Sequence, residues 1–184
     1  MSSLSPEQEI LVSFYEATRN EIVARLRLRD TFLASYTVAV AATIGFSKAA
    51  LGEPHTEALY ILPYLALAFT MLVCYHHFAV ATLGMYLKQE LWPQLKTTGA
   101  IAPMFEVSAS YLQHRSGAWR LRAAGQLVVL LSPPVFCLIV NFHDASQSLP
   151  PRTLYWWFGL VAIALSGYVV NKAYRFPQSP QSDG

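Results

Sequence analysis

The sequence predicts an all-α integral membrane protein, a four-helix bundle whose helices 1 and 2 extend into the cytoplasm. Two observations carry this prediction. Runs of about 18 or more apolar residues are long enough to cross a hydrocarbon layer of ~30 Å. The chain has four long segments without Asp, Glu, Lys or Arg: 31–47, 58–87, 123–142 and 153–171. If the chain enters from the cytoplasm, every basic residue except Lys48 and Arg152 lies inside, which is the asymmetry that orients membrane proteins.

Composition supports a membrane domain over a soluble bundle. Hydrophobic residues make up 54% of the chain and charged residues only 13%, against about 25% charged in soluble proteins. A soluble bundle would need a polar face on each helix, and the four segments lack charge all the way round. The net charge of +2 does not favour nucleic acid as a partner. We therefore expect a multi-pass protein of the inner (plasma) membrane, with both termini cytoplasmic and the bilayer as its environment.

Residues 1–30 predict a cytoplasmic amphipathic helical arm. Ser5, Pro6 and Gln8 form a capping box with proline at the first helical position. No strong helix breaker follows before residue 50, so we expect one helix of about 45 residues, ~65 Å long. Apolar and half-polar side chains recur at three- and four-residue steps, namely Leu11, Tyr15, Thr18, Ile22 and Leu26. This stripe needs a partner, which is the segment 88–122, the same arm of another subunit, or the membrane surface.

The membrane domain is expected to occupy residues 31–175. Its spans are predicted at about 31–51, where Lys48 extends its side chain to the interface, and at 58–87, 123–142 and 153–171. Span two should continue toward Leu91, where Trp92 and Pro93 predict a stop. The cytoplasmic segment 88–122 is expected to contain a loop at 97–102 and a short helix from Pro103 to about His114. Residues 176–184 predict a disordered tail.

Pro133 and Pro134 lie near the middle of the third span. Each proline removes a backbone donor and frees a carbonyl about one turn earlier, here near Val129 and Leu130. Broken helices at this depth form gates and binding sites in some transporters. Because no charged residue lies at that depth, the sequence favours a structural kink over a gate.

His76 and His77 are the most reactive-looking side chains of the spans. A zinc site would need three or four converging ligands. Cys74, Glu90, Glu106 and His114 could contribute, but their spacing matches no closed metal motif. The alternatives are an interfacial histidine pair or a pH-responsive pair. We predict neither metal nor cofactor, and the candidate functional residues are His76, His77, Glu90, Glu106, Pro133 and Pro134.

Three segments, EILVSFYEATRNEIVARLRLRD, HHFAVATLGMYLKQELWPQL and FEVSASYL, resemble a family of small bacterial four-span proteins with an amphipathic cytoplasmic N-terminal helix and no established activity. The resemblance covers about half the chain, and Phe105 stands where tryptophan would be expected. It implicates Tyr15, Arg19, Glu21, Arg25, Arg29, His77, Tyr86, Glu90, Phe105 and Glu106. The size and topology are also similar to short multi-span effectors of bacterial defence systems.

No phosphate loop, paired acidic site or nucleophile triad can be assembled from the sequence. The leading hypothesis is a non-enzymatic interaction or regulatory module that acts through its cytoplasmic helices as a homo-oligomer, with a possible cytoplasmic protein partner. Its candidate interaction face is Leu11, Tyr15, Ile22 and Leu26. The alternative is an oligomeric pore or membrane-perturbing effector, and a membrane enzyme is the third possibility.

Overall fold

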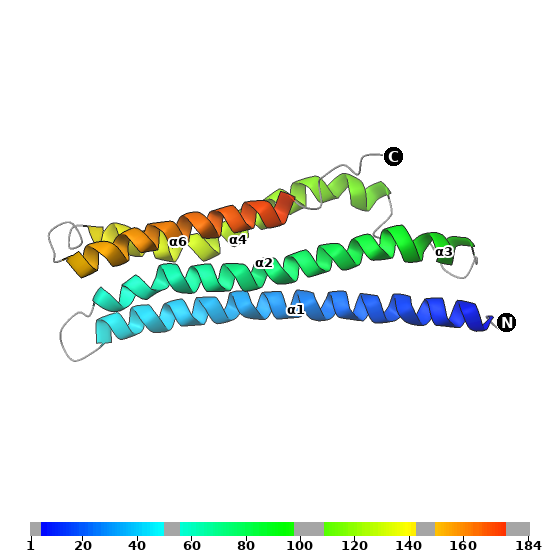
Figure 1. Ribbon diagram of the computed structural model, residues 1–184, viewed down its shortest axis with the longest axis horizontal. Coiled ribbons are helices and arrows are strands. Elements are labelled where there is room, and N and C mark those ends of the chain that lie inside the picture. The colour runs from blue at the N-terminus through cyan, green and yellow to red at the C-terminus, as the bar shows by residue number, and fades with distance from the viewer. Residues whose placement is uncertain (1–4, 50–55, 98–108, 143–149, 176–184) are drawn as a thin grey trace.

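The computed structural model describes residues 5–49, 56–97, 109–142 and 150–175, and within these ranges it is helical, with no strand. Long helices lie side by side along one axis (Figure 1). The elements are α1 (Pro6–Ala49), the 3₁₀ helix η1 (Thr56–Ile61), α2 (Leu62–Tyr86), the π-helix η2 (Leu87–Leu91), α3 (Trp92–Thr97), α4 (Ala109–Val140) and α6 (Pro150–Arg175). The predicted all-α class is confirmed for these residues. Glu106 and the predicted tail lie outside them.

Helix α1 begins at the predicted capping box. The Ser5 amide donates to Oε1 of Gln8 at 2.9 Å, and the Gln8 amide donates to Oγ of Ser5 at 3.3 Å. These two bonds satisfy amides that a helix start would otherwise leave without a partner. From there α1 runs for 44 residues without interruption, so the prediction of one long first helix is confirmed.

The stop predicted at Trp92 and Pro93 is wrong, because α2 continues through η2 into α3 and ends at Thr97. Pro93 cannot donate to the carbonyl four residues earlier, that of Gln89, and its ring crowds that carbonyl. The wider π-turn Leu87–Leu91 spans this position. A π-turn relieves the crowding locally, so the helix axis continues past the proline.

The short helix predicted to end near His114 is also wrong as a separate element. Helix α4 runs from Ala109 to Val140, which merges that segment with the third apolar segment. Its C-terminal end is capped by two side chains. Nδ2 of Asn141 donates to the Cys137 carbonyl and Nε1 of Trp156 to the Leu138 carbonyl, both at 2.9 Å. The predicted loop at 97–102 falls mostly outside the described residues.

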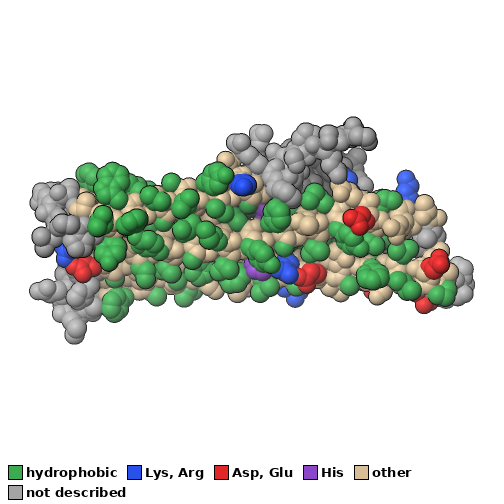
Figure 2. Space-filling view, in the orientation of Figure 1, with side chains coloured by type: hydrophobic (Ala, Val, Ile, Leu, Met, Phe, Trp, Pro, Cys, Tyr) green, Lys and Arg blue, Asp and Glu red, His purple; other side chains and the backbone are tan. Residues whose placement is uncertain are grey.

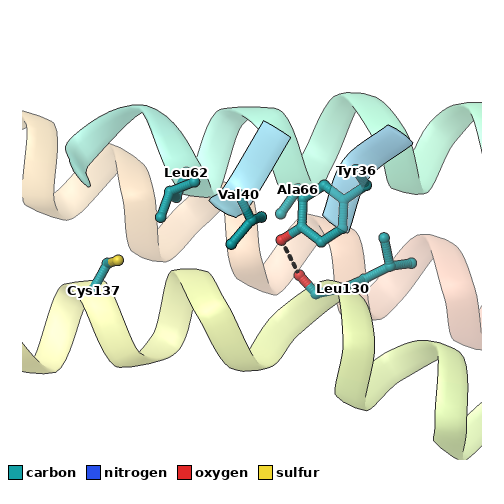
Figure 3. Packing of buried hydrophobic residues seen from close by; sticks show 6 residues of the cluster. All are labelled: Tyr36, Val40, Leu62, Ala66, Leu130 and Cys137. Atoms are coloured by element: carbon teal, nitrogen blue, oxygen red, sulfur yellow. Dashed lines mark hydrogen bonds between the residues drawn. The ribbon is translucent and has the colours of Figure 1, made fainter. Parts of the chain in front are cut away.

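Helix α2 is the centre of the packing, since it contacts α1, α4 and α6 along their lengths, whereas α1 barely meets α4. The core that α1, α2 and α4 share is small and apolar, and consists of Tyr36, Val40, Leu62, Ala66, Leu130 and Cys137 (Figure 3). Gly159 allows α6 to approach closely, because a Cβ there would lie 3.1 Å from Leu138 and 3.3 Å from Pro63.

The surface divides into two regions. One is the apolar section, formed by residues 31–47 of α1, 62–86 of α2, 124–140 of α4 and 153–171 of α6, whose outward side chains are largely hydrophobic. The other is the stalk, formed by residues 6–30 of α1 with η2 and α3. On the face shown in Figure 2, charged side chains lie along the stalk and at the end of the apolar section that is opposite the stalk.

Two described stretches, Glu57–Thr97 and Arg152–Tyr174, are long and apolar enough to cross a membrane, and Ala124–Val140 is a shorter apolar helix. The apolar section has a charged residue at each edge. Glu57 and Arg152 form an ion pair at one edge, and Asp30 lies at the other.

In the stalk, the predicted stripe of α1 lies half-buried. Leu11, Tyr15, Thr18, Ile22 and Leu26 are all of this class. Helix α1 contacts both η2 and α3, and those elements bury Leu87, Leu91 and Leu95. Three partners were considered for the stripe. The structure favours the chain's own segment 88–122, which begins in η2 and α3.

Candidate functional site

Polar side chains from α1, α2, α4 and α6 gather where the apolar section meets the stalk. We call this group the polar cluster. It comprises Arg29, Asp30, His76, His77, Gln126 and Tyr174. Since the rest of the shared interior is mostly apolar, this is the level at which four helices place their polar chemistry together.

His77, Tyr174 and Gln126 connect three helices in sequence. The His77 ring stacks on Tyr174 with centroids 4.2 Å apart, which ties α2 to α6. The Tyr174 hydroxyl donates a hydrogen bond to Oε1 of Gln126, which ties α6 to α4. Tyr174 and Gln126 are both buried. A buried polar pair that satisfies itself fixes the register of its helices, because breaking it leaves polar atoms unsolvated.

Arg29 is the contribution of α1, and it is only 2% exposed. Its Nε and Nη2 donate to Oδ1 of Asp30 at 3.0 Å and 2.6 Å, while the Asp30 side chain remains 64% exposed. A buried guanidinium is costly without a partner, so Asp30 stabilises an arginine at a position of the stripe where an apolar residue is expected.

His76 lies among aromatic rings at the edge of the cluster. Its ring stacks on Phe32 at 5.4 Å and meets the edge of Tyr75 at 5.3 Å. Nδ1 of His76 and Nε2 of His77 are buried, and neither has a hydrogen-bond partner in the part of the chain that the structure describes. Because buried polar atoms are nearly always bonded, these two nitrogens are the positions where the cluster can accept or donate a further hydrogen bond.

Just outside the cluster, Arg25 lies over the Tyr75 ring, 5.9 Å from its centroid. Its Nε donates to Glu21 at 2.6 Å, and the hydrogen bonds to Glu21 and then Tyr75 raise the pKa of Arg25 above its ordinary value. The Arg25 side chain therefore stays cationic, and it lies on the stalk side of the polar cluster.

A groove of about 420 Å³ opens between α1 and α4 next to the cluster. Its walls carry both polar and apolar side chains, namely Asp30, Leu33, Ala34, Thr37, Gly125, Gln126 and Val129. The groove exists because α1 and α4 make few contacts with each other. The space beside Gly125 is also open, since a Cβ at this position would meet no atom within 4 Å. Asp30 and Gln126 belong to the cluster and the groove alike.

Beside the groove, one hydrogen bond bridges α1 and α4. The Tyr36 hydroxyl donates to the Leu130 carbonyl at 2.8 Å, and both residues are buried (Figure 3). Pro134 lies four residues after Leu130 and has no amide hydrogen to donate to that carbonyl. The freed acceptor predicted from the two prolines is therefore used inside the protein, by a tyrosine of a neighbouring helix.

The structure brings together some of the predicted site residues and not others. His76 and His77 lie in or beside the polar cluster, and Pro134 frees the acceptor for Tyr36. Glu90 is exposed in η2, ~20 Å along the helix from His77 at 1.5 Å per residue. Among the described residues no three His, Cys, Asp or Glu side chains lie close enough to hold a metal ion.

Sequence reasoning missed Tyr36, Gln126 and Tyr174 as members of a site, and it considered Arg29 only for topology and through the family resemblance. A signal was present for two of them. Arg29 and Tyr36 continue the three- and four-residue spacing of the α1 stripe, so both were bound to face the partner helix. Gln126 and Tyr174 carried no such signal, because their meeting depends on how α4 and α6 pack.

Chemically, the cluster offers hydrogen bonds, two imidazoles, and an ion pair between the buried Arg29 and the exposed carboxylate of Asp30. Comparisons with protein-family models, with curated proteins and with solved structures gave no match.

Proposed function

We propose that the chain is a four-span protein of the inner membrane with both termini in the cytoplasm. Two stretches that are apolar enough to cross a membrane support this, as do the outward hydrophobic side chains on all sides of the apolar section. The shorter apolar parts of α1 and α4 share a core with α2, so they lie at the same depth as a span. The excess of basic residues on the stalk side supports the orientation.

Within the membrane, the protein acts without catalysis, as an interaction or regulatory module of a homo-oligomer. One observation carries this proposal: α1 runs without a break from the exposed stalk, past the polar cluster, into the core. A helix packed along its length moves as a unit, so a partner that binds the stalk would shift Arg29 and Tyr36 relative to α2 and α4. Small, exposed residues on α1 support association between copies, namely Ala34, Ala41, Ala42 and Gly45.

A second candidate function is an oligomeric pore, and the groove favours it. Asp30, Thr37 and Gln126 line the groove, so several copies could arrange polar groups around a path. The prolines supply little to such a path, because Tyr36 already binds the Leu130 carbonyl. We expect liposomes that contain the purified protein to retain a small anionic dye. Release of dye that disappears when Pro133 and Pro134 are both replaced by alanine would favour the pore.

Topology reporters test the membrane placement. Fusions after Asp183 and within residues 97–102 should report cytoplasmic positions, while fusions at Pro54 or Ser146 should report external ones. The expected pattern follows from the basic residues that flank the apolar section. An external signal from the C-terminal fusion would contradict the four-span arrangement.

A further inference from the structure

We propose that the groove between α1 and α4 binds a membrane lipid with an ammonium headgroup. The acyl chain would lie on Leu33, Ala34 and Val129, and the ammonium would meet Asp30. The inference depends on the proposed membrane placement, which puts the groove in the inner leaflet with Asp30 at headgroup level.

The dimensions and lining of the groove fit part of an amphiphile. Ligand sites typically enclose about 300 to 1,000 Å³, with mostly apolar walls and a few polar groups that fix orientation. The groove has about 420 Å³, and its polar residues Asp30 and Gln126 lie at the edge of the apolar section. The remainder consists of apolar side chains, the open position at Gly125, and Thr37, whose hydroxyl donates to the Leu33 carbonyl at 3.0 Å. A molecule with a polar head and an apolar tail matches this order.

The charge arrangement selects the headgroup. Arg29 is buried while the carboxylate of Asp30 is largely exposed, so the ion pair presents its negative end to the groove. The two Arg29 bonds to Oδ1 hold that carboxylate in one orientation. Among the side chains described, Asp30 is the charged residue that lines the groove. A cationic group is therefore the complementary one.

A lipid also fits better than a helix of a second copy. The apolar face of a helix laid in the groove would remove the exposed carboxylate of the Arg29–Asp30 ion pair from water without adding a further polar partner, and desolvating an ion pair is costly. A lipid brings its own cation and leaves Asp30 at the polar boundary. We therefore assign the groove to lipid, and association between copies is an outcome that the experiment would detect.

The test compares two lysolipids with the same acyl chain, lysophosphatidylethanolamine and lysophosphatidylglycerol. The full chain is purified in dodecyl maltoside and delipidated, and bound lipid per chain is measured by native mass spectrometry. An exposed ion pair is worth up to about 1 kcal/mol, so we expect about fivefold tighter binding of the ethanolamine lipid. Asp30→Glu should keep this preference, and Asp30→Asn should abolish it.

A matched pair of glycine variants tests the groove itself. Gly125→Leu places a side chain into the groove, where no atom lies within 4 Å of the new Cβ, and should weaken binding of both lipids at least tenfold. Gly167→Leu adds the same side chain at an equally open glycine of α6 and should bind like the wild type. If Gly125→Leu elutes abnormally in size-exclusion chromatography, Ala34→Leu fills the groove from the α1 side.

Three results would overturn the proposal. These are equal binding of the two lysolipids by the wild type, wild-type binding by both groove-filling variants, and a lipid-free dimer that Gly125→Leu dissociates. Failure of the membrane placement is separate, because the chain would then leave the membrane fraction on washing with alkaline carbonate. A chain that resists washing but lacks the lipid preference contradicts the groove assignment alone.

Discussion

The stalk and the apolar section use the same helix, α1, in different ways. In both regions α1 packs against the α2–η2–α3 run through one stripe with three- and four-residue spacing. In the apolar section none of its outward side chains is charged, and Val38 is 69% exposed. In the stalk, charged side chains recur on the outward face beside apolar ones such as Ile10, which is 57% exposed. The stripe thus faces the partner helix in both regions, whereas the presence or absence of charge on the outward face distinguishes the two regions.

The two regions also differ in how they treat polar groups. The stalk exposes its ion pairs, such as Glu21 with Arg25. The apolar section buries polar groups and pairs some of them internally, as Tyr36 does with the Leu130 carbonyl. The polar cluster lies between these regimes, with a buried Arg29 and an exposed Asp30. This difference is what the proposed boundary between water and hydrocarbon would require, because unsatisfied polar atoms are costly only where water is absent.

The largest expected effect comes from a charge on the outward face of the apolar section. Val38 lies about midway between Asp30 and Lys48. Val38→Asp should cost about 3 kcal/mol of membrane insertion, since an aspartate at the centre of a span costs about that much. The fraction of protein recovered in the carbonate-washed membrane measures this loss. Ile10→Asp, an equally outward change in the stalk, should leave the fraction unchanged, and equal behaviour of both variants would remove the distinction between the regions.

A smaller effect is expected from the stalk stripe. Ile22 is half-buried against the following helices, so Ile22→Asp should lower the free energy of unfolding by about 2 kcal/mol through lost burial and an unpaired charge. Thermal unfolding of the detergent-solubilised protein measures it. Val23→Asp, one residue away on the exposed side, should shift stability by less than about 0.5 kcal/mol. If Ile22→Asp also leaves the melting temperature and oligomer size unchanged, the stripe is free for another partner.

The smallest expected effect concerns Tyr36. Tyr36→Phe should cost about 1 kcal/mol, because it leaves the buried Leu130 carbonyl without its donor. Pro134→Ala returns a backbone amide that can donate to the same carbonyl. The cost of Tyr36→Phe should therefore shrink toward zero in the Pro134→Ala background, as measured by a double-mutant cycle on thermal stability. An undiminished cost would mean that the hydroxyl stabilises the protein in some other way.

Several elements could be predicted from sequence because their cause is local. The capping box at Ser5 and Gln8 fixes the start of α1, and the absence of a strong breaker fixes its length. The expected stop at Pro93 failed because a π-turn, not visible in the pattern, accommodates the proline. The separate helix near His114 failed because the residues between His114 and the third apolar segment do not break the helix, so both belong to α4.

The candidate site was predictable only in part. The His76–His77 pair attracted attention because its residue type is rare in an apolar segment. Glu90 was a candidate because it lies on the same long helix as His77. At ~20 Å along that helix, its side chain is too far away to contact the two histidines. Tyr174 and Gln126 stand 48 positions apart in the chain and meet only when α4 and α6 pack on α2. No periodicity within one helix carries that information.

The sequence by itself determined the helical class, the four charge-free segments and the face of α1 that packs, because helix formation and amphipathic spacing depend on near neighbours. Only the tertiary structure decided that α2 is central, that α1 and α4 leave a groove, and that Tyr36 takes the carbonyl freed by Pro134. These features depend on the rotation and depth of one helix relative to another. Side-chain volumes on several helices set them jointly, as at Gly159 against Leu138 and Pro63.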